Sequence, residues 1–419
     1  MMFKKMLALC LALLMIAGMS VSFSSCKKGN PDDDLQASPL PAIALQKDFD
    51  VPSDFKVGFI FLHDEKSTYD KNFMDAADEV QKLLGLSDSQ VIRRYPVNEE
   101  EECPVAAEYL VQQGCDIIFA DSFGHESGMM QVAANHPNVQ FCHATGTRAH
   151  TSELANFHNA FASIYEGRYL AGIAAGLKLN EMIKAGKITA EQAVMGYVGA
   201  YPYAEVKSGY TSFYLGAKSV CPSVTMKVNF TNSWYSVDDE RQNALALINS
   251  GCVLISQHAD SMGAPSACEE KNVPNISYNG STYAECPDSF IISSKINWAP
   301  YFLYMIKCVV TGTEIADDWC GGLEEGSVVL SGINEKVAAK GTKEAIEKAI
   351  ADLKAGTLHV FDTSKFTVNG QTLTAYKADV DYDDHFIPDT EVIYDGYFHE
   401  SEKRSAPYFD IDIDGITII

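Results

Sequence analysis

The amino-acid sequence predicts an α/β protein whose parallel sheets are covered by helices on both faces. From residue 55 onward, short apolar runs of strand length alternate with longer stretches in which apolar residues recur at helical spacing. Parallel strands joined by crossover helices require this alternation. The runs are also continuously apolar, as in residues 56–62, rather than alternating between apolar and polar. Continuous runs indicate strands that are buried on both faces, so the sheets lie inside the molecule.

The expected elements follow one another along the chain. The strand candidates are apolar runs bounded by polar turns: 56–62, 91–95, 117–120, 139–143, 193–198, 225–230, 253–257, 276–278 and 290–293. The helix candidates have apolar residues three and four positions apart: 73–84, 104–113, 165–178, 238–249 and 299–311. The helix expected at 165–178 carries Gly167, Gly172 and Gly176, which predicts close packing against a neighbouring element.

The composition is that of a globular protein with an acidic surface. The chain has 419 residues, 47% of them hydrophobic, which is enough for a sizeable core. It carries 32 Lys and Arg against 56 Asp and Glu, for a formal net charge of −24, and it has no long basic run. Nucleic-acid binding needs clustered basic residues that neutralise phosphates, so we expect no nucleic-acid partner.

The N-terminus has the pattern of an export signal. Lys4 and Lys5 precede the apolar stretch 6–23, which is followed by two serines and Cys26. This order resembles a bacterial lipoprotein signal, in which the cysteine is lipidated on its thiol and becomes the first residue of the mature chain. The alternative is a transmembrane anchor or an uncleaved signal, although the apolar stretch is short for a membrane span. Both interpretations place the rest of the chain outside the cytoplasmic membrane, and residues 26–53 are expected to form a lipid anchor and a flexible tether.

The cysteines and the motif search give no sign of a disulfide framework, a metal site or an enzyme. Without Cys10 of the signal and Cys26, the remaining cysteines are odd in number and have no Cys-x-x-Cys spacing. Motifs of phosphate-binding loops, dinucleotide sites, zinc proteases and nucleophile elbows are absent from the sequence. Residues 410–415 copy the start of a calcium loop, but its Glu ligand would fall beyond the last residue, so we expect a terminal strand there. We therefore predict no catalytic residue, no cofactor and no metal.

Polar and aromatic residues gather where the expected strands end. In open parallel sheets, the carboxyl ends of the strands and the neighbouring helix N-termini line the ligand crevice. The residues that we select as ligand-binding candidates come from such ends in both halves of the chain: Asp64, Tyr69, Ser122, Phe123, Gly124, Trp234, Asp260, Asn279, Gly280, Asn297 and Trp298. Each alone is ordinary loop chemistry, but their recurrence at successive strand ends predicts a binding crevice.

Five sequence motifs carry a family resemblance. They are 166–172 (EGRYLAG), 200–202 with 205–206 (AYP and EV), 232–235 (NSWY), 257–261 (QHADS) and 297–301 (NWAPY). Their order within residues 56–361 resembles the basic membrane protein family, which comprises lipid-anchored substrate-binding proteins of ABC importers similar to the purine nucleoside receptor lipoproteins. The resemblance implies a type I periplasmic-binding fold, in which three crossing strands join two doubly wound lobes and the ligand lies between them.

The resemblance also implies how the chain is divided and what it binds. The expected divisions are a signal at 1–25, the anchor and tether at 26–53, a first lobe from 54–157 and 287–330, a second lobe from 158–286 and 331–364, and a β-rich extension at 365–419. The implied ligand is a purine nucleoside or a purine base. The implied partners are the permease and ATPase of an ABC importer, and we expect the receptor itself to be a monomer.

The candidate residues suit a purine. A flat ring is held best between aromatic side chains, so we expect Trp234 of one lobe and Tyr69 or Phe123 of the other to stack on it. The ring edge and the ribose need directional hydrogen-bond partners. The candidates for this role are Asp64, Asp260, Asn279 and Asn297. By the resemblance, Asp260 is the best supported of all the candidates and Trp234 is the next.

Two alternatives stay open beside the purine receptor. A receptor for a sugar or another small solute on the same fold would also use Trp, Asp and Asn. A nucleoside-processing enzyme would need several metal-binding aspartates after the first strand, where only Asp64 stands. Lys295 lies one or two positions before the place where nucleoside-binding relatives have a ligand lysine, which leaves base versus nucleoside open.

Overall fold

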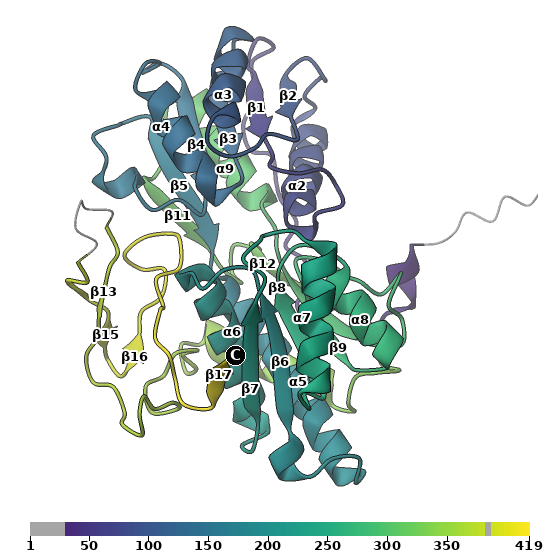
Figure 1. Cartoon of the computed structure of the whole chain (residues 1–419). Coiled ribbons are helices and arrows are strands. Elements are labelled where there is room, and N and C mark those ends of the chain that lie inside the picture. The colour runs from purple at the N-terminus through teal and green to yellow at the C-terminus, as the bar shows by residue number, and fades with distance from the viewer. Residues whose placement is uncertain (1–29, 382–386) are drawn as a thin grey trace, which may run out of the picture.

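The computed structural model describes residues 30–381 and 387–419 and consists of two α/β lobes (Figure 1). Within these residues, one lobe is built on a six-stranded sheet and the other on a seven-stranded sheet. Strand pairs in both sheets are parallel, except the pair of β10 with β12. The predicted α/β class with two doubly wound lobes is confirmed. The expected signal at 1–25 and the lipidation site Cys26 lie outside the described residues.

The first lobe has the strand order β11-β5-β4-β3-β1-β2. Its strands are β1 (Val57–Ile60), β2 (Val91–Arg94), β3 (Ile117–Ala120), β4 (Gln140–Ala144), β5 (Phe157–Ala162) and β11 (Asp318–Gly321). Its helices are α2 (Thr68–Leu84), α3 (Glu102–Gln112), α4 (Glu126–Ala133) and α9 (Ala299–Thr311), with the short 3-10 helices η2 (Phe123–His125) and η3 (Ala149–Thr151). Every residue of β1 and β3 is buried, which accounts for their continuous apolar runs.

The second lobe has the strand order β12-β10-β9-β8-β6-β7-β17. Its strands are β6 (Val194–Gly199), β7 (Thr225–Phe230), β8 (Leu254–His258), β9 (Asn275–Tyr278), β10 (Phe290–Ile296), β12 (Val328–Leu330) and β17 (Ile416–Ile418). Its helices are α5 (Ile164–Lys184), α6 (Ala204–Val220), α7 (Val237–Asn249), α8 (Gly263–Lys271) and α10 (Thr342–Lys354), with the 3-10 helix η4 (Ala190–Gln192). The predicted close packing of the glycine-rich helix α5 is confirmed, because a Cβ at Gly172 or Gly176 would collide with the backbone of α6.

The chain crosses between the lobes three times, as the resemblance implied. It passes from β5 to α5, from β10 to α9, and from β11 to β12. The predicted assignment of all of 287–330 to the first lobe is wrong for β10 and β12, because β10 pairs with β9 and β12 pairs with β10. An apolar run has the same pattern in either sheet, so the sequence could not place β10.

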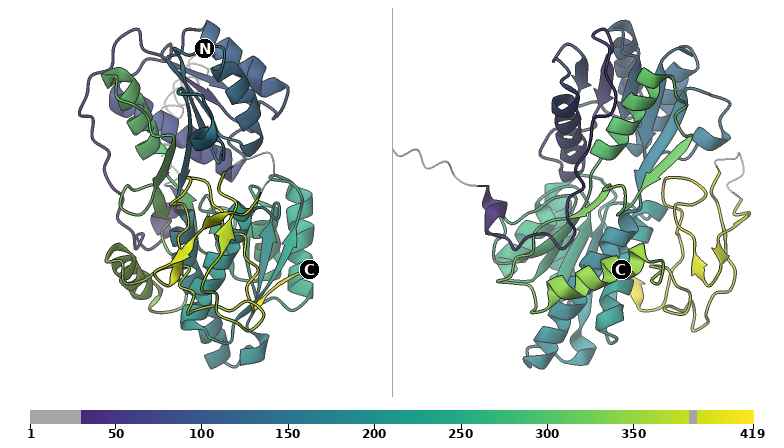
Figure 2. Two further views of the ribbon diagram at one scale, coloured as in Figure 1. Left: turned by 90° about the vertical axis from the view of Figure 1, so that its left-hand side faces the viewer. Right: turned by 180° about the vertical axis from the view of Figure 1, so that it is seen from behind.

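Residues 30–54, the N-terminal strap, pack along both lobes and do not form the predicted flexible tether (Figure 2). Asp32 accepts a hydrogen bond of 2.8 Å from Ser281 of the second lobe. Asp48 forms an ion pair of 2.5 Å with Lys307 of the first lobe. The strap, which includes the 3-10 helix η1 (Pro31–Asp34), has turn-forming residues without periodicity, so its partners were not visible in the sequence.

The C-terminal extension, residues 365–419, also contacts both lobes. It contains the short strands β13 (Lys377–Ala378), β14 (Thr390–Glu391), β15 (Ile393–Tyr394) and β16 (Tyr397–Phe398), and it ends in β17, which pairs in parallel with β7. Ser405 donates hydrogen bonds of 2.7 and 2.5 Å from its backbone and hydroxyl to Asp318 of the first lobe. The terminal strand begins later than predicted, since Asp414 instead accepts hydrogen bonds from a neighbouring loop.

The cysteines of the described residues fill core positions. All nine are free, and eight of them are buried, in line with the prediction of no disulfide framework. Burial raises the pKa of Cys142 to about 12, which keeps its thiol protonated. Across residues 30–381 and 387–419, no group of three or more His, Cys, Asp and Glu side chains is arranged to hold a metal ion.

Candidate ligand-binding site

A narrow hollow lies between the two lobes. Its lining comes from the carboxyl ends of strands and from the first turns of helices, where ligands bind in open α/β sheets. The first lobe contributes Leu62, His63, Tyr69, Asp70, Ser122, Phe123 and Thr145, and the second contributes Glu205, Trp234, His258, Asp260 and Tyr278. Neither lobe alone completes the lining, so the hollow exists only when the two lobes face each other.

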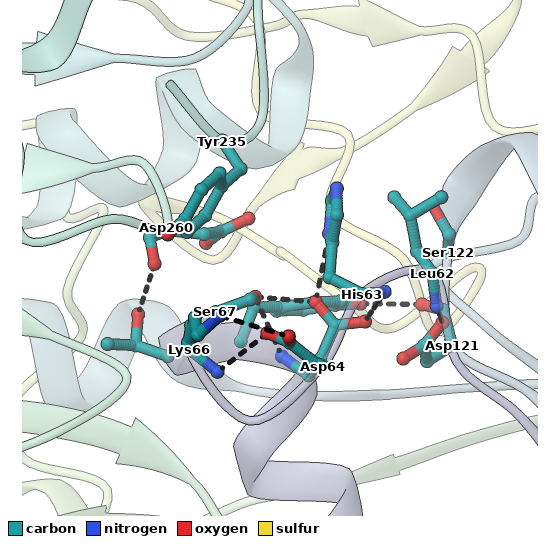
Figure 3. Close-up of polar contacts among 12 residues, drawn as sticks. Leu62, His63, Asp64, Lys66, Ser67, Asp121, Ser122, Tyr235 and Asp260 are labelled. Atoms are coloured by element: carbon teal, nitrogen blue, oxygen red, sulfur yellow. Dashed lines mark hydrogen bonds and ion pairs between the residues drawn. The ribbon is translucent and has the colours of Figure 1, made fainter. Parts of the chain in front are cut away.

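The wall supplied by the first lobe is centred on Asp70, which is buried in the first turn of α2. The backbone N–H of His63 donates a hydrogen bond of 2.7 Å to Asp70, and the hydroxyl of Ser67 donates another of 2.5 Å to the same carboxylate. Figure 3 shows His63 and Ser67 in this network. Ser67 is also the N-cap of α2. Burial alone would raise the pKa of Asp70, but the hydrogen bonds from His63 and Ser67 hold this pKa below its usual value. Asp70 is therefore a fixed negative charge.

A second buried carboxyl, Asp121, lies at the end of β3. It accepts a hydrogen bond of 3.0 Å from the backbone N–H of Leu62, and its own carbonyl accepts one of 2.8 Å from the hydroxyl of Tyr69. Burial, and then the charge of Asp70, raise the pKa of Asp121 well above the usual range. Asp121 therefore favours its neutral form more than Asp70 does.

The wall supplied by the second lobe contains Asp260, which is 6% exposed at the end of β8. Its backbone N–H donates to the carbonyl of Trp234, and its carbonyl accepts a bond of 3.0 Å from Thr68 of the first lobe, so the lobes touch at the site. Burial raises the pKa of Asp260 well above its usual value, and the charges of Asp70 and of two nearby glutamates raise it further. The carboxyl of Asp260 therefore favours a proton or a hydrogen-bond donor of a ligand.

Three neighbouring side chains complete this second-lobe wall. The Nε2 atom of His258 lies 3.5 Å from the carboxylate of Glu205, and the His258 ring packs on Tyr278 with centroids 4.4 Å apart. Burial lowers the pKa of His258, against the opposing effect of Glu205. The Nδ1 atom of His258 and the hydroxyl of Tyr278 are buried without a hydrogen-bond partner in the described part of the chain. A buried polar group left unpaired costs about 1–3 kcal/mol, so a ligand that pairs with them binds more tightly.

Phe123 and Trp234 of the lining belong to a cluster of aromatic rings. Tyr201 and Tyr203 are stacked with centroids 5.0 Å apart, and Trp234 meets Tyr201 edge-on at 5.1 Å. Phe123 of the first lobe approaches Tyr203 of the second at 5.8 Å. Because Trp234 and Phe123 both line the hollow from different lobes, a flat ligand can stack on rings from either side.

The structure divides the predicted ligand-binding residues into two sets. Those that line the hollow are Tyr69, Ser122, Phe123, Trp234 and Asp260. Those that do not line it are Asp64, Gly124, Asn279, Gly280, Asn297 and Trp298. The predicted strand ends therefore include loops that line the hollow, but six of the selected side chains in those loops do not line it.

Trp298, predicted near the ligand, is instead a core residue of the first lobe. It is 1% exposed, its ring stacks on Phe73 at 4.4 Å, and Phe119 packs beside it. Asn297 shapes the crossing between the lobes, because its side-chain amide donates to the carbonyl of Gly326 over 3.2 Å. The chain has already left the second sheet at this point, which carries both side chains away from the hollow.

Asp64 and Gly124 are held by neighbours outside the hollow. Asp64 accepts a hydrogen bond of 3.1 Å from the backbone of Lys66 and lies 3.6 Å from its ammonium group (Figure 3). The backbone N–H of Gly124 donates to Glu99 over 2.8 Å, and Glu99 also accepts a bond of 2.5 Å from Ser122. Lys66 of the same loop thus satisfies Asp64, and Glu99 of the loop after β2 satisfies the backbone N–H of Gly124.

Asn279 and Gly280 miss the lining by one and two positions. Asn279 ends β9 with a positive φ of 58°, is 1% exposed, and has no hydrogen-bond partner for its side chain among the described residues. Gly280 lies near Thr68 of the first lobe. The preceding residue, Tyr278, supplies the side chain that lines the hollow.

Sequence reasoning passed over Asp70, Glu205 and Tyr278. Asp70 and Glu205 stand in the first turns of α2 and α6, beside strand ends. An acidic residue in the first turn of a helix that follows a strand could have predicted both positions, because the N-termini of such helices face the ligand crevice. Tyr278 belongs to a strand that is buried throughout, and nothing in its pattern distinguishes it from a core residue.

The two-lobed fold with a lined hollow between the lobes is the type I periplasmic-binding fold. The family described as PnrA-like ABC transporter substrate-binding proteins (Bmp) matches residues 65–356. The chain therefore belongs to this family, and the resemblance seen in the sequence is confirmed.

Similar proteins agree with this assignment. A purine-binding protein of Brucella abortus (strain 2308) is 30% identical over 74% of this chain and 80% of its own length. An ABC transporter glucose-binding protein of Haloferax volcanii is 32% identical over 62% of this chain and 64% of its own. The solved structure of a solute-binding protein of an ABC transporter system from Aeropyrum pernix K1 has a TM-score of 0.60 at 18% identity, over 73% of this chain and 93% of that one, which shows the shared fold.

Proposed function

We propose that this protein is an extracytoplasmic receptor of an ABC importer that binds a purine nucleoside or a purine base between its lobes. The proposal is carried by buried polar atoms that lack partners in the described chain and belong to residues lining the hollow from both lobes: Thr145 Oγ1 and Tyr278 OH. Folded proteins pair nearly all buried polar atoms, so these groups call for a ligand with donors and acceptors on its edge.

A purine matches the rest of the lining. Its flat faces stack on Trp234 and Phe123, and each aromatic partner contributes roughly 1–3 kcal/mol. Its N–H groups face Asp260, whose carboxyl accepts hydrogen bonds when ionised and donates one when protonated. The hydroxyls of Tyr278 and Thr145 serve the ring nitrogens or a ribose. The name of the Brucella relative, a purine-binding protein, supports this choice.

The charges of the lining favour an uncharged ligand. Asp70, Glu205 and Asp260 are acidic, and the lining residues of the described chain include no Lys or Arg. A phosphorylated nucleotide would bring negative charge against this set, and like charges brought together in an interface cost several kcal/mol.

A sugar receptor is the second candidate. Carboxylates beside a tryptophan also suit sugar hydroxyls and the apolar face of a sugar ring, and the Haloferax relative is named for glucose. A nucleoside-processing enzyme has less support, since the matched family consists of substrate-binding proteins.

We further propose that the receptor works at the membrane as a lipid-anchored monomer. Lipid on Cys26, after removal of residues 1–25, would keep it near its permease and ATPase. Across the described residues, no helix combines the length and the apolar character that a bilayer crossing needs. Labelled fatty acid should enter the wild-type chain during growth and be absent from Cys26→Ser.

Mass spectrometry of the small molecule that co-purifies with the mature chain tests the ligand class. We expect a purine nucleoside or base, and a sugar would favour the second candidate. Chromatography after a long incubation with inosine or adenosine should return the nucleoside unchanged. Release of free base and ribose would refute the receptor and support a hydrolase.

A further inference from the structure

A buried arginine lies behind the second-lobe wall. Arg168 of α5 is 0% exposed. Its guanidinium donates to the hydroxyl of Ser256 over 2.7 Å, to that of Tyr197 over 3.1 Å, and to groups of Ser277 and Ser294 over 3.3 Å. All of these partners are neutral, and no carboxylate of the described chain forms an ion pair with Arg168. Buried charges are normally paired, so this arginine needs another source of compensation.

The compensating charges lie on the far side of two rings. The Cζ atom of Arg168 lies 5.0 Å from the centroid of Tyr278, whose ring packs on His258 at 4.4 Å. His258 in turn lies 3.5 Å from the carboxylate of Glu205. Arg168, the pair of rings and Glu205 thus form successive layers from the core of the second lobe to the hollow. The two rings and Glu205 line the hollow, and Arg168 does not.

We propose that Arg168 is the positioning residue of the second-lobe wall and the counter-charge of Glu205, acting through Tyr278 and His258. The proposal rests on the proposed function and adds the group that lets the Glu205 carboxylate remain in the wall of the site. A guanidinium is planar and always charged, so four hydrogen bonds fix its orientation beneath the Tyr278 ring. In the low dielectric of the interior its field reaches the carboxylate of Glu205 beyond the rings.

The counter-charge role of Arg168 can be tested on ligand-free protein, because the pKa of His258 responds to the charge of Arg168. Burial lowers the pKa of His258, Glu205 opposes this effect, and Arg168 adds to the lowering. Tyr278, on the other side of the ring, is neutral. Removing the charge with Arg168→Met should raise the NMR titration midpoint of His258 by about half a pH unit or more. Tyr197→Phe is the matched control, since it removes one hydrogen bond and keeps the charge. An unchanged midpoint in Arg168→Met overturns the counter-charge.

The positioning role is tested with Arg168→Lys, which keeps the charge and loses the planar fork. We expect the His258 midpoint of the wild type, together with binding of adenosine or adenine that is about fivefold weaker or more. Wild-type affinity in Arg168→Lys overturns the positioning role, and this variant stays informative if Arg168→Met does not fold. The NMR titration needs no ligand, so its outcome is independent of whether the purine proposal holds.

Discussion

The two walls of the hollow differ in how their carboxyl groups are satisfied. In the first-lobe wall, Asp70 receives hydrogen bonds from His63 and Ser67 and remains ionised below its usual pKa. In the second-lobe wall, the carboxyl of Asp260 makes no hydrogen bond within the described residues, and its pKa is raised by burial. His258 likewise keeps an unpaired ring nitrogen.

This difference indicates that the two walls have different roles in binding. A wall whose carboxylate already has hydrogen-bond partners is preorganised and sets the charge of the site, although Thr145 Oγ1 of the same wall has no partner among the described residues. A wall with unpaired groups lowers the stability of the ligand-free protein and gains free energy when a ligand pairs with it. We therefore expect recognition to depend chiefly on the second lobe.

The largest expected effect is discrimination against phosphate. Adenosine monophosphate should bind at least about 100-fold more weakly than adenosine, because its phosphate adds negative charge to a lining with Asp70, Glu205 and Asp260. Calorimetric titration of both compounds measures the ratio. Similar affinities would show that the fixed charge of the first-lobe wall does not face the ligand.

Asp260→Asn should weaken purine binding by roughly 5- to 150-fold, which corresponds to an unpaired group of about 1–3 kcal/mol. The same change should stabilise the ligand-free protein near pH 7. The pKa of Asp260 is higher in the folded state than in the unfolded state, so its carboxyl lowers the free energy of unfolding as pH rises through the folded pKa. Asparagine does not ionise, so the variant keeps the free energy of unfolding that the wild type loses. Calorimetry and urea denaturation measure the two effects.

Asp64→Asn is the matched control for this change, since Asp64 also follows a strand but does not line the hollow. It should leave affinity within about twofold of wild type. Full affinity of Asp260→Asn for every purine tested would make Asp260 a structural residue.

Trp234→Ala should lower purine affinity about tenfold, corresponding to about 1.4 kcal/mol of lost stacking, with the fold intact. Trp234→Phe should recover most of the loss, because a smaller ring still stacks. Fluorescence or calorimetric titration reads both variants. Unchanged binding in the alanine variant would remove Trp234 from the site and leave recognition to the polar groups.

The smallest effect on affinity is expected in the first-lobe wall. Ser67→Ala removes the N-cap of α2 and a hydrogen bond to Asp70, so the free energy of unfolding should fall by about 1 kcal/mol. The depressed pKa of Asp70 contributes stability that is present above its unfolded pKa and lost as pH falls, so this variant should also lose part of its acid dependence. Affinity should change less than about threefold. A larger loss of affinity than of stability would move recognition to the first lobe.

Sequence pattern was enough for the fold class, because continuous apolar strands and helical spacing are local signals. The sheet to which a strand belongs is not a local signal, because it depends on pairing with a distant segment. The strand β10 belongs to the second sheet because it pairs with β9. At the site, Asp260 and Trp234 were found because they end strands, whereas Trp298 has the same position in its motif but packs in the core. Arg168 was visible only as part of a motif, since its neutral partners come from four distant strands.

The central claim is that both walls close on one uncharged purine, which is released unchanged. Calorimetric titration of the mature chain with adenosine, inosine, adenine, hypoxanthine and glucose tests it most directly. We predict saturable binding of at least one purine at one site per chain. At a hundred times its dissociation constant, that purine should raise the free energy of unfolding by about 2.7 kcal/mol. Saturable binding of glucose with no heat from any of the purines would contradict the account.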